Sequence, residues 1–383
     1  MLSQFQTLQL PPLSLYIHIP WCLRKCPYCD FNSHQSDDIP ERLYVASLID
    51  DLNQELDAVQ GRELQSIFFG GGTPSLFSGD AINDILCAVK QRIRFASDIE
   101  ITLEANPGTA EQNKFSDYCS AGVNRLSIGV QSFEQTQLQK LGRVHSGNEA
   151  IAAVGIAQQA GFTDINIDLM HGLPGQREAQ ASADLQRAMA LGASHISWYQ
   201  LTIEPNTAFY SAPPILPSDD YLADIQQAGE ILLAEGGYQQ YETSAYAKVG
   251  KQARHNRNYW LFGDYIGIGA GAHGKLTSAV TGTIQRRWKT RQPNNYLDPQ
   301  KAFCSGEKTL KAAELPLEFM MNALRLNGGF EPLLYQQRTG LSLVDIADTL
   351  SDLQHRGLLV SESDFIAPTE LGRRFLNELL AAF

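Results

Sequence analysis

Three cysteines lie within eight residues, at Cys22, Cys26 and Cys29, directly after the apolar run 13–19. Iron–sulfur cubanes are usually held by four cysteine thiolates, so three thiolates bind three irons and leave the fourth open. The fourth ligand then comes either from elsewhere in the chain or from an exogenous molecule. The loop therefore predicts a cluster site with one iron reserved for another ligand.

Zinc and disulfides are the alternatives for this loop. Structural zinc takes four ligands, usually in two pairs, and no later Cys-x2-Cys pair occurs, although His18 or His34 could complete a site. A disulfide framework is disfavoured because the chain is long and lacks a secretory leader. The three other cysteines are scattered singly and are interpreted as small buried apolar residues: Cys87, Cys119 and Cys304.

Composition limits the class of protein. The chain has 383 residues, 43% of them hydrophobic and 19% charged, as in soluble globular proteins of two or three domains. No apolar run is long enough to span a bilayer, and we expect a cytoplasmic protein. A formal net charge of -12 argues against nucleic acid as a partner. The dense basic stretch 285–291 is interpreted as a solvated strand or loop edge.

Short apolar runs alternate with helical stretches, which is typical of βα units around a parallel sheet. The predicted strands are 13–19, 66–69, 100–104, 125–129, 164–169 and 195–201. The predicted helices between them are 40–59, 80–94, 111–121, 147–161 and 177–191. Six units are too few to close an eight-stranded barrel, so we expect a partial, open βα barrel.

Unusual residues follow the carboxyl ends of five of these strands, where parallel βα folds place their sites. The cysteine loop follows the first strand, Gly70 to Pro74 the second, and Glu104 ends the third. Gln131 follows the fourth strand and Asp168 closes the fifth. Carboxylates at the ends of apolar strands are costly without a partner, so we expect a polar ligand at this rim.

The pattern changes after residue 205. We expect an N-terminal extension over 1–12, the partial barrel over 13–205, a smaller α+β segment over 206–313 and a C-terminal module over 314–383. The last module has helical apolar spacing before short strands, which suggests a winged helix. It carries ten Asp and Glu against five Arg and no Lys, which favours contact with protein over DNA.

The cysteine spacing is the signature of the radical S-adenosylmethionine (SAM) proteins, in which SAM fills the open iron. Four further segments resemble the oxygen-independent coproporphyrinogen III oxidase group of this superfamily: LYIHIPWC at 15–22, GGGTP at 70–74, GVQSF at 129–133 and DLMHGLP at 168–174. The resemblance covers about residues 13–375. It implies a 4Fe-4S cluster and SAM as cofactors.

The resemblance also implies residue roles. Cys22, Cys26 and Cys29 would bind the cluster. The implied SAM contacts are Tyr16 at the methionine end, Tyr28 near the ligand, Gly71, Gly72 and Thr73 at the amino acid, Glu104 and Gln131 at the ribose, Arg143 at the carboxylate, Asp168 as a further polar contact and Leu201 at the adenine.

Two departures separate this chain from the oxidases. The oxidases resemble Cys-x3-Cys-x2-Cys-x-Cys, whereas Phe31 stands at the fourth cysteine here, so we doubt decarboxylation of coproporphyrinogen. The segment 255–260, HNRNYW, resembles a motif of related haem chaperones. Imidazole is a common axial ligand to haem iron, and this implies haem contact by His255, Tyr259 and Trp260.

Two functions follow from these resemblances. The first is a haem chaperone on a radical SAM scaffold, with haem as cargo. Its expected acceptor is an apo-haem-protein such as a respiratory enzyme. We also expect an electron donor for the cluster and a dimer that depends on the cluster. The second is a radical SAM enzyme that decarboxylates coproporphyrinogen III. The tetrapyrrole is common to both, and whether SAM is cleaved distinguishes them.

Overall fold

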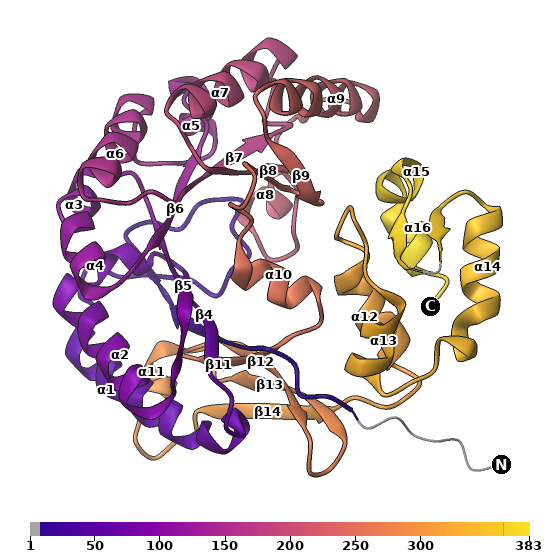
Figure 1. Cartoon of the computed structure of the whole chain (residues 1–383). Helices are drawn as coiled ribbons and strands as arrows, with labels where there is room; N and C mark the ends of the chain where they lie inside the picture. The colour runs from indigo at the N-terminus through magenta and orange to yellow at the C-terminus, as the bar shows by residue number, and fades with distance from the viewer. Residues whose placement is uncertain (1–7, 363) are drawn as a thin grey trace.

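The computed structural model describes residues 8–362 and 364–383, and its centre is one sheet of twelve strands (Figure 1). Six neighbouring strands are parallel and follow the chain order: β1 (Leu13–Ile19), β4 (Leu64–Gly71), β5 (Phe95–Ala105), β6 (Arg125–Gln131), β7 (Ile165–His171) and β8 (His195–Gln200). Nearly every position of β1 and β7 is buried, and the polar residues among them, such as Ser14 and Asn166, have hydrogen-bond partners inside the sheet. The predicted open α/β architecture of six βα units is confirmed.

Helices cover the outer face of this curved sheet (Figure 1). The long ones are α1 (Glu41–Gln54), α2 (Gly79–Arg92), α6 (Gly147–Gln159) and α7 (Glu178–Ala190). Ser78 caps α2 by accepting a hydrogen bond from the Ala81 N–H, and Ser146 forms a capping box with Glu149 at α6. The minor elements here are β2 (Trp21–Cys22), β3 (His34–Gln35), α5 (Gln135–Lys140) and the 3-10 turns Leu56–Val59 and Pro74–Leu76.

The prediction of one continuous helix over 111–121 was wrong. The stretch 111–121 forms two short helices, α3 (Thr109–Gln112) and α4 (Phe115–Ala121). The break falls at Lys114, whose Nζ donates to the carbonyls of Ser75, Leu76 and Phe77. Anchoring the ammonium to the Pro74–Leu76 turn redirects the chain, and sequence periodicity alone does not contain this tertiary contact.

The segment 206–313 extends the same sheet at both edges. On one side, β11 (Asp264–Ile268) is parallel to β1 and leads to antiparallel β12 (His273–Ser278), β13 (Thr283–Lys289) and β14 (Cys304–Thr309). On the other side, β10 (Ala245–Ala247) and β9 (Gln239–Glu242) continue from β8. The sheet stays open because β14 and β9 are its two ends. Four helices belong to this segment: α8 (Ala208–Ser211), α9 (Asp219–Glu235), α10 (Arg254–Trp260) and α11 (Pro293–Tyr296).

The C-terminal residues form a separate hydrophobic cluster around Phe319 and Leu353. Three helices precede a two-stranded antiparallel ribbon and two short helices, beside the barrel (Figure 1). The elements are α12 (Leu315–Ala323), α13 (Pro332–Thr339), a 3-10 turn (Leu343–Ile346), α14 (Ala347–His355), β15 (Leu359–Ser361), β16 (Ile366–Pro368), α15 (Glu370–Arg374) and α16 (Leu376–Leu380). This order is the expected one, and the winged-helix assignment stays a prediction.

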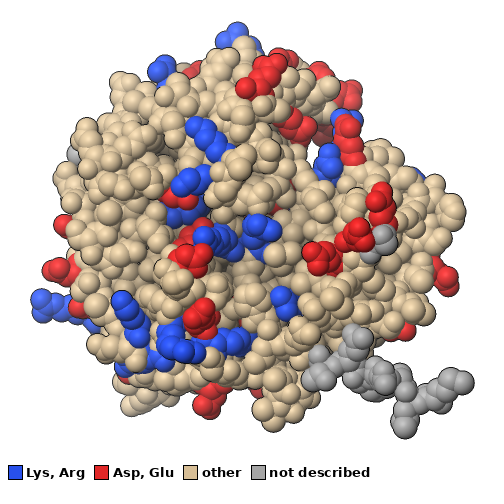
Figure 2. Space-filling view, in the orientation of Figure 1, with Lys and Arg blue, Asp and Glu red and all other residues tan. Residues whose placement is uncertain are grey.

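Charges of both signs share the face shown in Figure 2, where Lys and Arg side chains near the middle lie beside Asp and Glu side chains. In the part of the chain that the structure describes, no helix has the length and apolar character needed to cross a membrane. The predicted N-terminal extension over 1–12 falls largely outside the described residues, which begin at residue 8.

Candidate functional site

The three cysteines of the loop face one cavity of about 350 Å³ at the carboxyl ends of the parallel strands. Cys22, Cys26 and Cys29 are half-buried, free thiols. The loop turns tightly, with the Cys29 N–H donating to the Cys26 carbonyl over 3.1 Å. Burial raises the pKa of Cys22 and Cys29, while hydrogen bonds from Thr73 and Ser33 oppose that rise for Cys22.

The spread of the thiols suits a cluster better than a single ion. Among residues 8–362 and 364–383, no three His, Cys, Asp or Glu side chains lie close enough to hold one metal ion. Tetrahedral zinc requires its ligands about 2.0–2.3 Å from one centre, whereas a cubane binds each thiolate at a different iron. The donor set is thus three thiols around an open cavity, without a fourth protein ligand at position 31.

Two carboxyl groups lie in the same cavity at the ends of β5 and β7. Burial, and secondarily the nearby Asp168, raises the pKa of Glu104 to about 8. Its Oε2 accepts a hydrogen bond from the Gly71 N–H at 3.3 Å. Burial also raises the pKa of Asp168, whose oxygens accept hydrogen bonds from Ser127 and Asn166. Both groups can accept a hydrogen bond from a ribose hydroxyl or an ammonium group, and in the protonated form they can donate one to a hydroxyl oxygen.

Arg143 joins the cysteine loop to the sheet. Its Nη2 donates to Asn106 Oδ1 and to the Gly129 carbonyl, both at 2.7 Å, and its Nη1 lies 3.6 Å from Cys26 Sγ. The guanidinium is thereby held in one orientation, which is the condition for recognising a planar carboxylate. The same guanidinium lies beside the thiol of Cys26 and so connects the cysteine loop to β6 through Gly129.

Gln131 and residues 71–74 of the glycine loop also line the cysteine cavity, as expected for the predicted site. Gln131 has φ +69°, uncommon for a residue other than glycine, and its Oε1 accepts from the Tyr199 hydroxyl at 2.8 Å. Gly71 has φ +116°, and a Cβ there would lie 2.6 Å from the His18 ring. A Cβ at Gly72 would lie 2.5 Å from the Trp21 carbonyl oxygen. Both glycines are thus required by packing of this loop, Gly71 against β1 and Gly72 against β2.

The structure brings together most of the predicted SAM residues. Nine of the ten line the cysteine cavity: Tyr28, Gly71, Gly72, Thr73, Glu104, Gln131, Arg143, Asp168 and Leu201. Leu201 is buried and its N–H donates to the His171 carbonyl. Tyr16 instead lines an adjoining cavity and contacts His18 Nδ1 through its hydroxyl at 3.0 Å.

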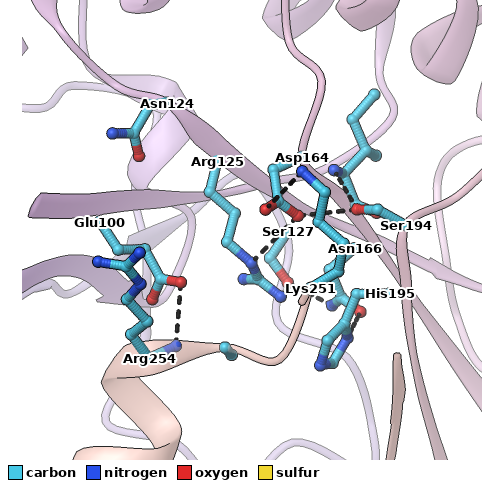
Figure 3. Close-up of polar contacts among 12 residues, drawn as sticks. Glu100, Asn124, Arg125, Ser127, Asp164, Asn166, Ser194, His195, Lys251 and Arg254 are labelled. Atoms are coloured by element: carbon cyan, nitrogen blue, oxygen red, sulfur yellow. Dashed lines mark hydrogen bonds and ion pairs between the residues drawn. The ribbon is translucent and has the colours of Figure 1, made fainter. Parts of the chain in front are cut away.

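The predicted haem residues lie on α10, which packs inside the sheet beneath the cavities. Glu100 accepts a hydrogen bond from the Arg254 N–H at one oxygen (Figure 3) and from the His255 N–H at the other, and thus caps the helix. The His255 ring is buried, with Nδ1 2.9 Å from Ser66 Oγ and Nε2 2.7 Å from the Tyr259 hydroxyl. Both ring nitrogens therefore have partners, which favours a hydrogen-bonded core histidine over an iron ligand.

Trp260 points away from both cavities toward the C-terminal residues. The Arg325 guanidinium lies 4.4 Å from the centre of the indole ring, a cation–π contact. Arg325 also pairs with Glu242 at 3.3 Å. Of the three predicted haem residues, Tyr259 lines the adjoining cavity, whereas His255 and Trp260 hold α10 in place.

Sequence reasoning missed a polar layer deeper in the barrel. Figure 3 shows Arg125 directed toward Asp164, with Asn166 between Ser127 and His195. This layer supports Asp168, because Ser127 and Asn166 both donate to its carboxylate. Tyr199 was also missed, although its place one residue before the end of β8 is the signal that could have found it.

Comparison with known proteins is consistent with this geometry. Residues 16–188 match the radical SAM superfamily, and residues 310–375 match the HemN C-terminal domain. The heme chaperone HemW of Haemophilus influenzae is 51% identical over 98% of each chain, and that of Escherichia coli is 51% identical over 98% of this chain and 99% of that one. The coproporphyrinogen III oxidase HemN of Escherichia coli superposes with a TM-score of 0.82 over 99% of this chain and 91% of that chain, at 23% identity.

The fold and the cysteine cavity define a radical SAM protein, a class that carries a 4Fe-4S cluster and SAM. Within this class, the near full-length identity decides the family. The chain belongs to the HemW family. The likeness to the oxidase shows the shared fold alone.

Proposed function

We propose that this protein is a haem chaperone that binds haem and delivers it to an acceptor protein. The observation that carries the proposal is 51% identity over nearly the whole chain to two curated heme chaperones. Phe31 supports it, because this side chain stands at the position of the fourth cysteine in the oxidase pattern and is 60% exposed at the cavity rim.

The cysteine cavity would hold the cofactors. Cys22, Cys26 and Cys29 would bind three irons of a 4Fe-4S cluster, and Arg143 would orient the carboxylate of SAM. A cluster of this kind supplies one-electron chemistry when bound. Glu104 and Asp168 would accept hydrogen bonds from the polar groups of SAM, since both line the same wall.

The proposal includes partners. The acceptor is an apo-haem-protein, for which a respiratory enzyme is one example, and an electron donor would reduce the cluster. We also propose a cytoplasmic location and a dimer that depends on the cluster, since exposed residues of the cysteine loop, such as Leu23 and Phe31, could lie at an interface.

Anaerobic reconstitution followed by titration with haemin tests the function. We expect a Soret band that saturates near one haem per chain, and transfer of that haem to an apo-acceptor. Formation of protoporphyrinogen and 5′-deoxyadenosine from coproporphyrinogen III would instead identify an oxidase. No saturable haem binding would contradict the proposal.

Cysteine variants test the cluster separately. Replacing Cys22, Cys26 or Cys29 by Ser should abolish the brown chromophore and the bound iron. The control is Cys87→Ser, because Cys87 is exposed on α2, outside the cysteine cavity, and its interpretation as a buried residue was wrong. A loop variant that keeps a full cluster would refute the ligand assignment.

A further inference from the structure

A second cavity, of about 480 Å³, adjoins the cysteine cavity. Phe31, Gly71 and Glu104 line both, so a molecule in the second cavity would lie directly beside the cluster loop. Its volume falls within the range of small-molecule sites, about 300–1,000 Å³. The cysteines and nine of the ten predicted SAM residues line the first cavity, and Tyr16 is the one that lines only the second.

One of the histidines at this cavity has free ring nitrogens. The two nitrogens of His18 contact the Tyr16 hydroxyl at 3.0 Å and the Asn32 carbonyl at 2.9 Å. His255 lies beneath the cavity wall and is also doubly bonded. His273, the first residue of β12, is exposed, and its ring forms no hydrogen bond within residues 8–362 and 364–383. An imidazole must keep a nitrogen lone pair free to bind iron, and His273 meets this condition.

A free cation lies on the same wall. Arg291 follows β13 and is exposed, and its guanidinium makes no ion pair in the described part of the chain. An arginine without an acidic partner at a cavity rim is suited to a planar carboxylate, to which it can donate two parallel hydrogen bonds. Haem carries two such groups, its propionates.

Aromatic rings supply the apolar surface that a macrocycle requires. Tyr259 and Tyr265 line the cavity with their ring centres 4.4 Å apart in an edge-to-face arrangement. Phe31 of the cluster loop lines the same cavity. Flat aromatic faces pack well against a flat conjugated ring, so this cavity combines a free imidazole, a free guanidinium and aromatic walls.

The cluster loop is tied to this wall by one side chain. The amide of Asn32, three residues after Cys29, donates hydrogen bonds at 2.9 Å to the carbonyls of Ala270 and Arg291. These carbonyls flank the backbone that presents His273 and Arg291. The cluster loop therefore fixes the backbone next to His273 and at Arg291.

We propose that haem binds in this second cavity, with the His273 imidazole as an axial ligand to the iron and Arg291 paired with a propionate. The proposal rests on the haem-chaperone function and assigns its cargo to a site different from the 255–260 motif. Haem placed there touches Phe31, which explains why this residue faces both cavities.

The test uses reconstituted full-length protein titrated with haemin. His273→Ala should weaken haemin binding by at least about tenfold, because the iron loses its protein ligand. His273→Met should keep the fold and shift the Soret band, because a thioether replaces the imidazole. His355→Ala is the matched control, since His355 is exposed on α14 and faces neither cavity.

The propionate contact is tested with the dimethyl ester of haemin. Wild-type protein should bind the ester more weakly than haemin, whereas Arg291→Gln should bind the two equally. If wild type and Arg291→Gln show the same preference for haemin over its ester, the role of Arg291 is overturned.

The outcomes separate this site from the function. Saturable binding to wild type, with an unchanged Soret band and affinity in both His273 variants, overturns the site and leaves the function standing. If a folded His255→Ala variant loses the ligation of haem iron and the His273 variants keep it, the proposed site is also overturned. Failure of wild-type protein to bind haemin refutes the proposed function itself.

Discussion

The Nε2 atom of His255 lies 2.7 Å from the hydroxyl of Tyr259, one helical turn later on α10. This contact joins the buried floor of the barrel to the wall of the second cavity, because Tyr259 lines that cavity and His255 contacts β4 through Ser66. The segment 255–260 thus has a structural role inside the sheet, and through Tyr259 it also lines the proposed haem site.

Removing the Tyr259 hydroxyl should lower the free energy of unfolding, and it should affect the ligation of haem iron less. Tyr259→Phe leaves the buried Nε2 of His255 without its partner, at a cost of about 1–3 kcal/mol in the free energy of unfolding. Urea denaturation measures this loss, and the Soret band of the haem complex should keep its position. A shifted Soret band with unchanged stability would contradict this reading of α10.

Glu104 should make stability depend on pH. Its folded pKa, raised to about 8 by burial and by Asp168, lies above the value near 4.3 of an unfolded chain. The folded state therefore holds the extra proton between these values, and stability falls as pH rises from about 4 to 8.

Glu104→Gln should remove part of this pH dependence, because the amide stays neutral. We expect it to stabilise the cofactor-free protein by about 1–3 kcal/mol at pH 8 and to change little at pH 5. Thermal unfolding at the two pH values measures the difference. The same change in stability at both pH values would show that the Glu104 carboxyl does not titrate in this range.

Arg143 should control SAM affinity. Arg143→Met removes the guanidinium held by Asn106 and Gly129, and we expect SAM to bind the reconstituted protein about tenfold more weakly. Calorimetric titration measures the affinity. Arg187→Met, on an exposed position of α7, is the control, and equal losses in both variants would argue against the assignment.

The contact between Trp260 and Arg325 should hold α10 against the C-terminal residues. Arg325→Met removes the cation–π contact and the ion pair with Glu242, and we expect a loss of about 1–2 kcal/mol in stability. Limited proteolysis should then cleave faster between α10 and α12. Unchanged cleavage together with unchanged unfolding would show that this contact is energetically neutral.

The parallel strands could be predicted because each is a short, largely apolar run between helical stretches, with a polar residue or a glycine loop at or after its carboxyl end. Cys22, Glu104 and Asp168 were located in this way, since parallel strands bring those ends together. The extension over 206–313 could not be placed. Its strands β10 and β11 are short, and they pair with β8 and β1 at opposite edges of the parallel strands, through residues far apart in the chain.

The site could be predicted only where a residue type has one dominant chemistry. Three cysteines at this spacing indicate an iron–sulfur loop, whereas a histidine has several roles that its partners decide. His255 was assigned to haem from its motif, and the structure gives both its nitrogens to Ser66 and Tyr259. His273 carries no motif, so its exposure beside a cavity is visible only in three dimensions.

The sequence by itself determined the βα order, the cysteine loop and the absence of a fourth cysteine at Phe31, because these depend on local composition and spacing. Only the tertiary structure decided which side chains share a cavity and which are occupied by internal hydrogen bonds. Hydrogen-bond partners such as Asn32 and Arg291 are separated by 259 residues. The physical reason is that a donor or acceptor is available to a ligand only after folding has satisfied the buried polar groups around it.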